Sequence, residues 1–137
     1  MKILYGLEKP TSGQIYLNGH EVKITSPLVA NSFGIGMVHQ HFMLVNELTV
    51  AENIFLGQEI TKNFRIDRKK TTEAVTKLAE KFGMSINPEE KVGNLSIVQK
   101  QKVEILKVLA RNAKIIIFDE PTAVLTPQET QEFFTQL

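Results

Sequence analysis

The stretch Ile115–Thr122, which reads Ile-Ile-Ile-Phe-Asp-Glu-Pro-Thr, decides the fold class of this chain. Its apolar residues follow one another without polar alternation, which is typical of a strand buried on both faces in a parallel sheet. Pro121 lacks a backbone donor and disfavours helix for the residue before it, so we expect the strand to end at the adjacent carboxylates. Asp119 and Glu120 are therefore expected at the carboxyl edge of a sheet, where open α/β folds bind ligands. By itself, the stretch is equally compatible with a core strand that ends in a polar loop.

Composition limits the class of protein. The chain has 137 residues, of which 42% are hydrophobic and 23% charged, as is usual for a soluble domain with one core. The formal net charge of +1 gives no electrostatic case for binding nucleic acid. There is no cysteine for a disulfide or thiolate site, and no apolar run approaches the roughly 20 residues that cross a bilayer. We expect a cytosolic protein, or one on the cytosolic face of another assembly.

Local signals predict the first elements. Met1–Leu7 is expected to be the end of an amphipathic helix closed by a glycine. Asn18-Gly19 lies between short β-rich runs and predicts a hairpin, because both residues tolerate a positive φ. Gly34–Val38 predicts a short buried strand.

Side-chain caps predict the helices that follow. Thr49 and Glu52 form a capping box, and Gly57 is a plausible end for that helix. Asp67 begins a second helix, which we expect to end at Gly83.

A third helix follows from the capping box of Ser96 and Gln99 and is expected to run to about Arg111. Its apolar stripe indicates one buried face. The opposite face is expected to turn charged residues outward, namely Lys100, Lys102, Glu104 and Lys107. A further capping box at Thr126–Glu129 predicts a last helix.

Three features occur in a fixed order along the chain: Gln40 after a short strand, Leu95-Ser96-x-x-Gln99 at a helix start, and the apolar strand that ends in Asp119-Glu120. With the Pro-Thr that follows, they resemble the nucleotide-binding domain of ABC transporters over essentially the whole chain. The resemblance implies an α/β, P-loop NTPase-like fold of the ABC ATPase type. Residues 1–137 would form part of one such domain, with an antiparallel β-hairpin and a helical subdomain at about residues 42–95.

Two pairs of stretches are similar to the branch that imports simple sugars and nucleosides: Met37–Phe42 with Leu48–Ile54, and Val103–Lys107 with Asp119–Glu129. This similarity implies a subunit that couples MgATP hydrolysis to uptake of a simple sugar or nucleoside. The implied partners are the membrane subunits, which would bind beside Gln40 and the helical subdomain, and a second nucleotide-binding domain in a head-to-tail dimer or tandem chain. The implied location is peripheral, on the cytoplasmic side of the cell membrane.

The resemblance also assigns roles, with ATP and Mg²⁺ as the cofactors. Gln40 would coordinate Mg²⁺ or the attacking water, Asp119 would hold Mg²⁺ largely through water, and Glu120 would be the general base. The signature motif would present the amides of a helix N-terminus to phosphate. Its residues are Leu95, Ser96, Ile97, Val98 and Gln99.

Each assignment has a structural alternative. Gln40 on its own could be a loop amide, whereas Ser96 and Gln99 suffice as a plain helix cap, a role compatible with phosphate binding. His39 and His41 suggest a metal, but no third ligand is near them in the sequence.

The sequence departs from the common family pattern at the signature motif, at Thr126, where an Asp is frequent, and in two missing features, the phosphate-binding loop and the switch histidine. Ile97-Val98 stands where Gly-Gly is usual, and a β-branched Val98 adds bulk where the backbone approaches phosphate. No Gly-x-x-x-x-Gly-Lys-Ser/Thr motif occurs, so the phosphate-binding loop is missing. We expect the sequence to begin just after that loop and to bind ATP poorly alone. The alternative functions are a non-catalytic remnant and a non-transport ABC-type ATPase module.

Overall fold

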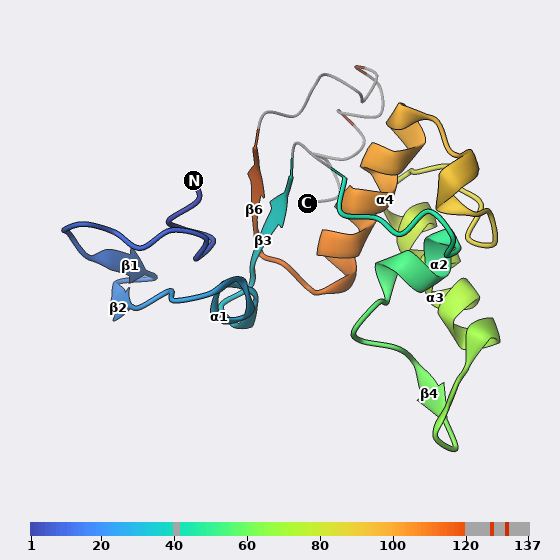
Figure 1. Ribbon diagram of the computed structural model, residues 1–137, viewed down its shortest axis with the longest axis horizontal. Coiled ribbons are helices and arrows are strands. Elements are labelled where there is room, and N and C mark those ends of the chain that lie inside the picture. The colour runs from blue at the N-terminus through green and yellow to red at the C-terminus, as the bar shows by residue number, and fades with distance from the viewer. Residues whose placement is uncertain (40–41, 120–126, 128–130, 132–137) are drawn as a thin grey trace.

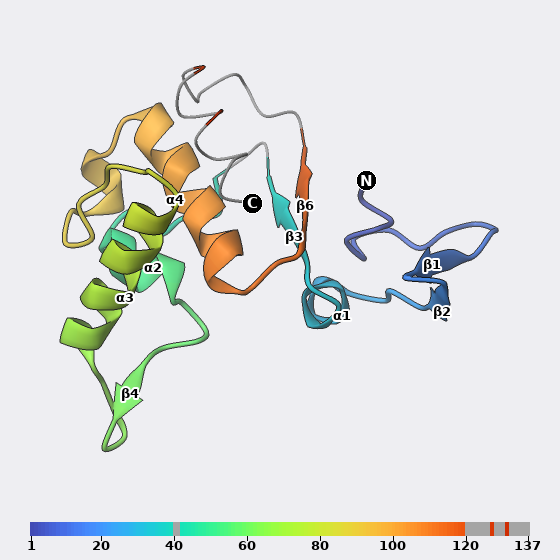
Figure 2. The same cartoon turned by 180° about the vertical axis from the view of Figure 1, so that it is seen from behind.

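A computed structural model describes residues 1–39, 42–119, 127 and 131 of the chain. Figure 1 shows the hairpin β1–β2 at one end, the pair β3 and β6 in the middle, and helices α2, α3 and α4 at the other end. Figure 2 gives the same arrangement from behind. The elements in order are β1 (Ile15–Leu17), β2 (His20–Val22), α1 (Pro27–Ser32), β3 (Ile35–Val38), α2 (Val50–Ile54), β4 (Thr61–Lys62), β5 (Arg65–Ile66), α3 (Arg68–Lys81), a 3-10 turn (Val92–Asn94), α4 (Ile97–Ala110) and β6 (Ile115–Phe118).

The apolar run forms β6, which pairs in parallel with β3, so the predicted strand and its parallel pairing are confirmed. The register sets Ile35 opposite Ile115 and Val38 opposite Phe118. The expected burial on both faces is wrong for Ile115, which is 44% exposed. The physical reason is that β6 pairs only with β3 within the described part of the chain.

The predicted hairpin is confirmed. Leu17 lies opposite His20, and Asn18 and Gly19 make the turn with φ values of 51° and 81°. Both values lie in the left-handed region that this type of turn requires.

The expected helix at Met1–Leu7 is wrong, because the segment consists of turns. A stretch this short gains too few backbone hydrogen bonds to offset helix nucleation. Gly6 has a φ of +78°, and a Cβ there would lie 2.6 Å from the backbone carbon of Ser26. Packing against that loop therefore bends the segment and buries Tyr5.

The predicted starts of α2, α3 and α4 are confirmed, whereas Thr126 and Glu129 of the further capping box lie outside the described residues. Both capping boxes are complete, and the Asp67 side chain accepts a hydrogen bond from the Lys70 amide at 3.1 Å. Helix α2 ends at Ile54, before the expected Gly57. Helix α3 ends at Lys81, two residues before the expected Gly83, with Phe82 as its C-cap.

Two elements carried no sequence expectation. Helix α1 begins with Ser26 as its N-cap and Pro27 in its first turn. The hairpin β4–β5 turns at Asn63 and Phe64, both with positive φ. A non-glycine pair in this conformation gives a weak hairpin signal, which explains why the pattern was missed.

The main core lies between α2, α3, α4 and the inner strand β3. Its completely buried members include Val50, Val75, Val92 and Val103, each 0% exposed. A smaller cluster joins Tyr5, Ile24 and α1 to the other side of β3 and β6. Within the described ranges, no helix is both long enough and apolar enough to span a bilayer.

The expected outward face of α4 is partly wrong. Lys102 and Glu104 are only 8% and 3% exposed, and Lys100 and Lys107 are half-buried. Helix α4 contacts α2, α3 and β3, so more than one of its faces is covered. Amphipathic spacing indicates one buried face and does not show that a second neighbour covers the polar one.

Candidate functional site

The carboxyl edge of the parallel pair carries Asp119. Its amide donates to the Val38 carbonyl at 3.1 Å, which extends the β3–β6 ladder by one residue and leaves the side chain half-buried. His39 follows β3 at the same edge, with its ring 5.7 Å from that of Tyr5 at an interplanar angle of 70°. The next residue on each strand is a predicted site residue, Gln40 or Glu120, and both lie outside the described residues.

The predicted signature segment is the start of α4. Ser96 Oγ accepts from the Gln99 amide at 3.3 Å, and Gln99 Oε1 accepts from the Ser96 amide at 3.0 Å. Leu95 is 8% exposed and anchors the segment in the main core, whereas Ile97 and Val98 are 67% and 40% exposed. The helix start therefore presents its first amides and two apolar side chains to the outside.

The strand β6, which Asp119 follows, and the start of α4 lie apart in both ribbon views (Figures 1 and 2). Within the part of the chain that the structure describes, no group of three His, Cys, Asp or Glu side chains could hold a metal ion. Mg²⁺ keeps several waters and takes one or two carboxylates together with substrate phosphates. Asp119 as the described carboxylate at this edge fits such an ion.

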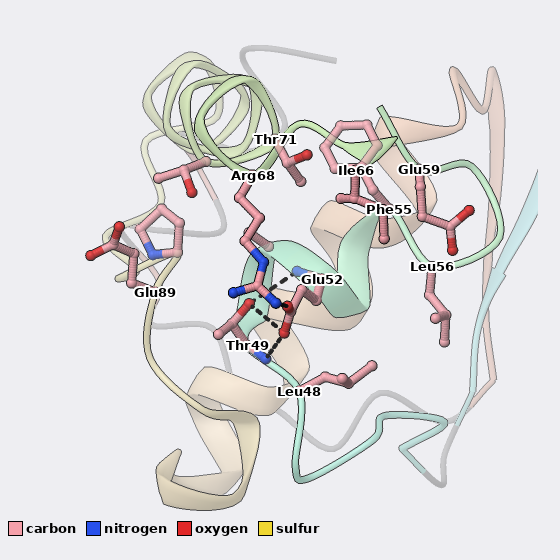
Figure 3. A pocket seen from close by; sticks show the side chains of 13 residues that line it. Leu48, Thr49, Glu52, Phe55, Leu56, Glu59, Ile66, Arg68, Thr71 and Glu89 are labelled. Atoms are coloured by element: carbon pink, nitrogen blue, oxygen red, sulfur yellow. Dashed lines mark hydrogen bonds and ion pairs between the residues drawn. The ribbon is translucent and has the colours of Figure 1, made fainter. Parts of the chain in front are cut away.

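A pocket of about 340 Å³ lies between α2, α3 and the β4–β5 hairpin, and the sequence did not indicate it (Figure 3). Its floor and walls are mostly apolar and include Leu48, Phe55, Leu56 and Ile66. Leu48, Phe55 and Leu56 flank α2 and Ile66 lies in β5, so no single periodic stretch of sequence contains them. The sequence signal for this pocket is the apolar pair Phe55-Leu56 directly after the capped helix α2, of which Leu56 is 39% exposed.

An ion pair lies at the wall of this pocket (Figure 3). The Thr49 amide and hydroxyl donate to Glu52 Oε2 at 2.9 and 3.2 Å, and Arg68 Nη2 lies 3.6 Å from Glu52 Oε1. The Thr49 amide lowers the pKa of Glu52 most, burial opposes this, and the Thr49 hydroxyl, Arg68 and Lys91 add to the lowering. The pocket thus combines an apolar interior with a carboxylate that stays ionised at neutral pH.

Comparison with known proteins identifies the family. The family model described as ABC transporter matches residues 1–123. The chain is 53% identical over 132 residues to the guanosine import ATP-binding protein NupO of Bacillus subtilis, covering 96% of this chain and 26% of that protein. It is 40% identical over 134 residues to the ribose import ATP-binding protein RbsA 3 of Rubrobacter xylanophilus, covering 98% of this chain and 27% of the relative.

Solved structures agree on the fold. A nucleotide-free ATP-binding cassette from an ABC transporter matches with a TM-score of 0.75 and 25% identity, covering 98% of this chain and 57% of that one. A dimeric ATP-binding cassette bound to ADP and Pi matches with a TM-score of 0.73, 24% identity and coverage of 98% and 60%. The expected α/β fold of the ABC ATPase type is confirmed. On the match to residues 1–123 and these relatives, the chain belongs to the ABC transporter family.

Proposed function

We propose that this chain is part of an ATP-binding, ATP-hydrolysing subunit of an importer for nucleosides or simple sugars. The observation that carries the proposal is the parallel β3–β6 pair with Asp119 at its carboxyl edge. Its support is the 53% identity over 132 residues to a guanosine import ATP-binding protein, and for this reason we propose nucleosides before simple sugars. The chain spans 26% of that relative, so the activity belongs to the longer protein.

We propose catalytic roles for the residues at the carboxyl ends of β3 and β6. MgATP, when bound, supplies the phosphoryl group that hydrolysis transfers to water. Asp119 would hold waters of the Mg²⁺ shell, Glu120 would take the proton of the attacking water, and Gln40 would orient that water. The support for Asp119 is its place at the strand end, and that for Gln40 and Glu120 is their position in the sequence next to described strand residues.

The second proposed surface is the start of α4. The exposed Ile97 and Val98, together with the capped Ser96, suit a contact with nucleotide held by another nucleotide-binding domain. A dimeric cassette among the matched structures supports such an arrangement. The bulk of Val98 predicts a weaker phosphate contact than glycine would give.

The third proposed surface is the pocket beside α2, within the helical subdomain of about residues 42–95. We assign it to the membrane subunits, because an apolar hollow with an ionised rim suits an amphipathic helix tip. Such docking would hold the protein on the cytoplasmic side of the membrane as a peripheral subunit.

A chimera tests the proposal. The chain replaces the matched segment of the guanosine import protein, whose identity of 53% over 132 residues makes the exchange conservative. We expect MgATP hydrolysis, and we expect Glu120→Gln to lower it at least about tenfold, because a general base contributes about 10²–10⁴-fold. A folded chimera that binds nucleotide but does not hydrolyse it would support the non-catalytic alternative instead.

A further inference from the structure

The segment that follows Gln40 runs between two helices and is held by both. On the α4 side, the Met43 amide donates to Glu104 Oε1 at 2.7 Å, and the Met43 carbonyl accepts from Lys107 Nζ at 2.9 Å. Glu104 and Lys107 are three residues apart on α4, so their side chains leave the same helix face. Together they bind both backbone polar groups of a single residue.

These contacts use the backbone of Met43 and not its side chain, which is 64% exposed. Glu104 is 3% exposed, and a carboxylate this buried is costly unless hydrogen bonds compensate for the lost water. The bond from the Met43 amide to Glu104 is strong, because its acceptor is charged and only 2.7 Å away, and it compensates for part of this cost. The pair therefore fixes the path of the chain at Met43, whichever side chain stands there.

On the α2 side, Asn53 holds the next part of the segment. Its Oδ1 accepts from the Val45 amide at 2.8 Å, and its Nδ2 donates to the Val45 carbonyl at 2.9 Å and to the Thr49 carbonyl at 3.0 Å. Asn53 is 0% exposed, so water does not compete for these bonds. The short segment from Met43 to Val45 is thus bonded to α4 at one end and to α2 at the other.

We propose that Glu104 and Lys107 are positioning residues that lock Met43, three residues after Gln40 in the sequence, to α4, so that α4 and the segment Met43–Val45 shift as one unit. The proposal deepens the function proposed above, because that function gives Gln40 its role. Hydrogen bonds connect the two helices through this segment. Asn53 on α2, the helix beside the pocket, bonds to Val45, and Glu104 and Lys107 on α4 bond to Met43. A displacement of α2 would therefore reach Met43, which follows Gln40 closely in the sequence, and through it α4.

Amide hydrogen exchange, read residue by residue by NMR on the complete chain without nucleotide, tests the clamp. Glu104→Ala should speed exchange at Met43 at least about tenfold, because hydrogen bonds to charged groups are the stronger ones. Glu104→Gln keeps an acceptor and should restore protection.

Lys107→Met keeps the aliphatic stem and removes the donor to the Met43 carbonyl, so the amides of Met43 and Val45 should exchange faster while the helix remains. Glu73→Ala, on the exposed face of α3, is the matched control.

The amides of Val103 and Leu106 report on α4 itself. If Glu104→Ala leaves Met43 protected, the clamp is overturned. If Met43 and the α4 amides accelerate together in both the alanine and the glutamine variant, Glu104 serves only the general stability of the core and the inference fails.

The chimera then separates the clamp from the proposed function. Glu104→Ala should lower kcat for MgATP about tenfold with KM nearly unchanged, and Glu104→Gln should recover it, because misplacing an orienting group affects the chemical step. Unchanged kcat in a variant whose Met43 exchanges faster overturns the positioning role. A chimera without hydrolysis defeats the proposed function, whereas the exchange result still decides whether Glu104 and Lys107 hold Met43.

Discussion

Gly36 shows at the scale of one residue how closely α4 approaches the sheet. A Cβ at this position would lie 2.3 Å from Val108 Cγ1 and 3.1 Å from the Ala113 Cβ. Contacts this short require the Val108 side chain, the helix or the strand to shift. The absence of a side chain at Gly36 therefore sets the distance between β3 and α4, and with it the place of the Met43 clamp.

Gly36→Ala should lower the free energy of unfolding by about 1–3 kcal/mol, the usual cost of overpacking a core. Urea denaturation followed by circular dichroism measures it. Val108→Ala removes the closest atom, so Gly36→Ala should cost clearly less in that background, and equal costs in both backgrounds would contradict the steric explanation.

At the scale of elements, the capping boxes explain why α2 and α4 begin where they do. In each box, the side chain of the N-cap accepts from the third helical amide while the third residue bonds back to the N-cap amide. Backbone donors at the helix start are thereby satisfied without a partner from another element. This local satisfaction leaves the outer surface of Ile97 and Val98 free to meet a partner.

Ser96→Ala should lower the free energy of unfolding by about 1 kcal/mol, because the Gln99 amide loses its acceptor. Thermal unfolding measures the change, and Ser96→Asp should recover most of it since aspartate also caps helices. A Ser96→Asp variant that is stable yet hydrolyses MgATP poorly in the chimera would separate phosphate contact from capping. If Ser96→Ala leaves stability unchanged, the capping bond contributes nothing measurable.

The wall of the pocket on α2 predicts a pH dependence. The pKa of Glu52 lies below its ordinary value of 4.5, chiefly because the Thr49 amide donates to the carboxylate. Proton binding is therefore weaker in the folded state, so the contribution of Glu52 to stability is complete above its ordinary pKa and is lost as the pH falls through the lowered one.

Glu52→Gln should accordingly flatten the loss of stability between about pH 5 and the acid range, where carboxylates of native proteins take up protons. Urea midpoints at a series of pH values provide the measurement. Glu73→Gln on the exposed face of α3 is the control for the removal of one carboxylate. Identical profiles for Glu52→Gln and the parent chain would show that the Thr49 bonds do not favour the ionised form.

For the whole molecule, the structure separates three surfaces to which the proposed function assigns a role. The carboxyl edge of β3 and β6 carries Asp119, the start of α4 carries Ser96, and the pocket lies between α2, α3 and the β4–β5 hairpin. The Met43 segment connects the elements behind these surfaces. These links are short hydrogen bonds to backbone groups, and they join α2, beside the pocket, to α4.

Leu56→Asp should uncouple transport from hydrolysis. Leu56 lines the pocket and is 39% exposed, so a carboxylate there can remain hydrated while it disfavours an apolar partner. In the chimera, we expect guanosine uptake to fall by at least about tenfold while MgATP hydrolysis in detergent persists. Leu28→Asp on α1, where Leu28 is 79% exposed and does not line this pocket, is the control. Normal uptake by Leu56→Asp would exclude the pocket as the docking surface.

Features that depend on residues close together in the sequence could be predicted, whereas features that depend on distant residues could not. The capping boxes, the turn at Asn18-Gly19 and the strand Ile115–Phe118 depend on residues within a few positions of one another, and the structure confirms them. The order of the predicted site residues also gave the family, which the comparisons confirm. The roles of Gln40, Ser96, Asp119 and Glu120 stay predictions, because the structure tests only where Ser96 and Asp119 lie.

The tertiary structure decided which polar groups are buried and what they hold. Nothing within one helical turn of Glu104 indicates that its partner is the Met43 amide, 61 residues earlier in the chain. The pocket beside α2 and the exposed edge at Ile115 likewise depend on which elements become neighbours. Local hydrogen bonds and apolar periodicity are properties of short stretches and can be read from the amino acids. The burial of a charge and the shape of a pocket exist only once distant segments pack together.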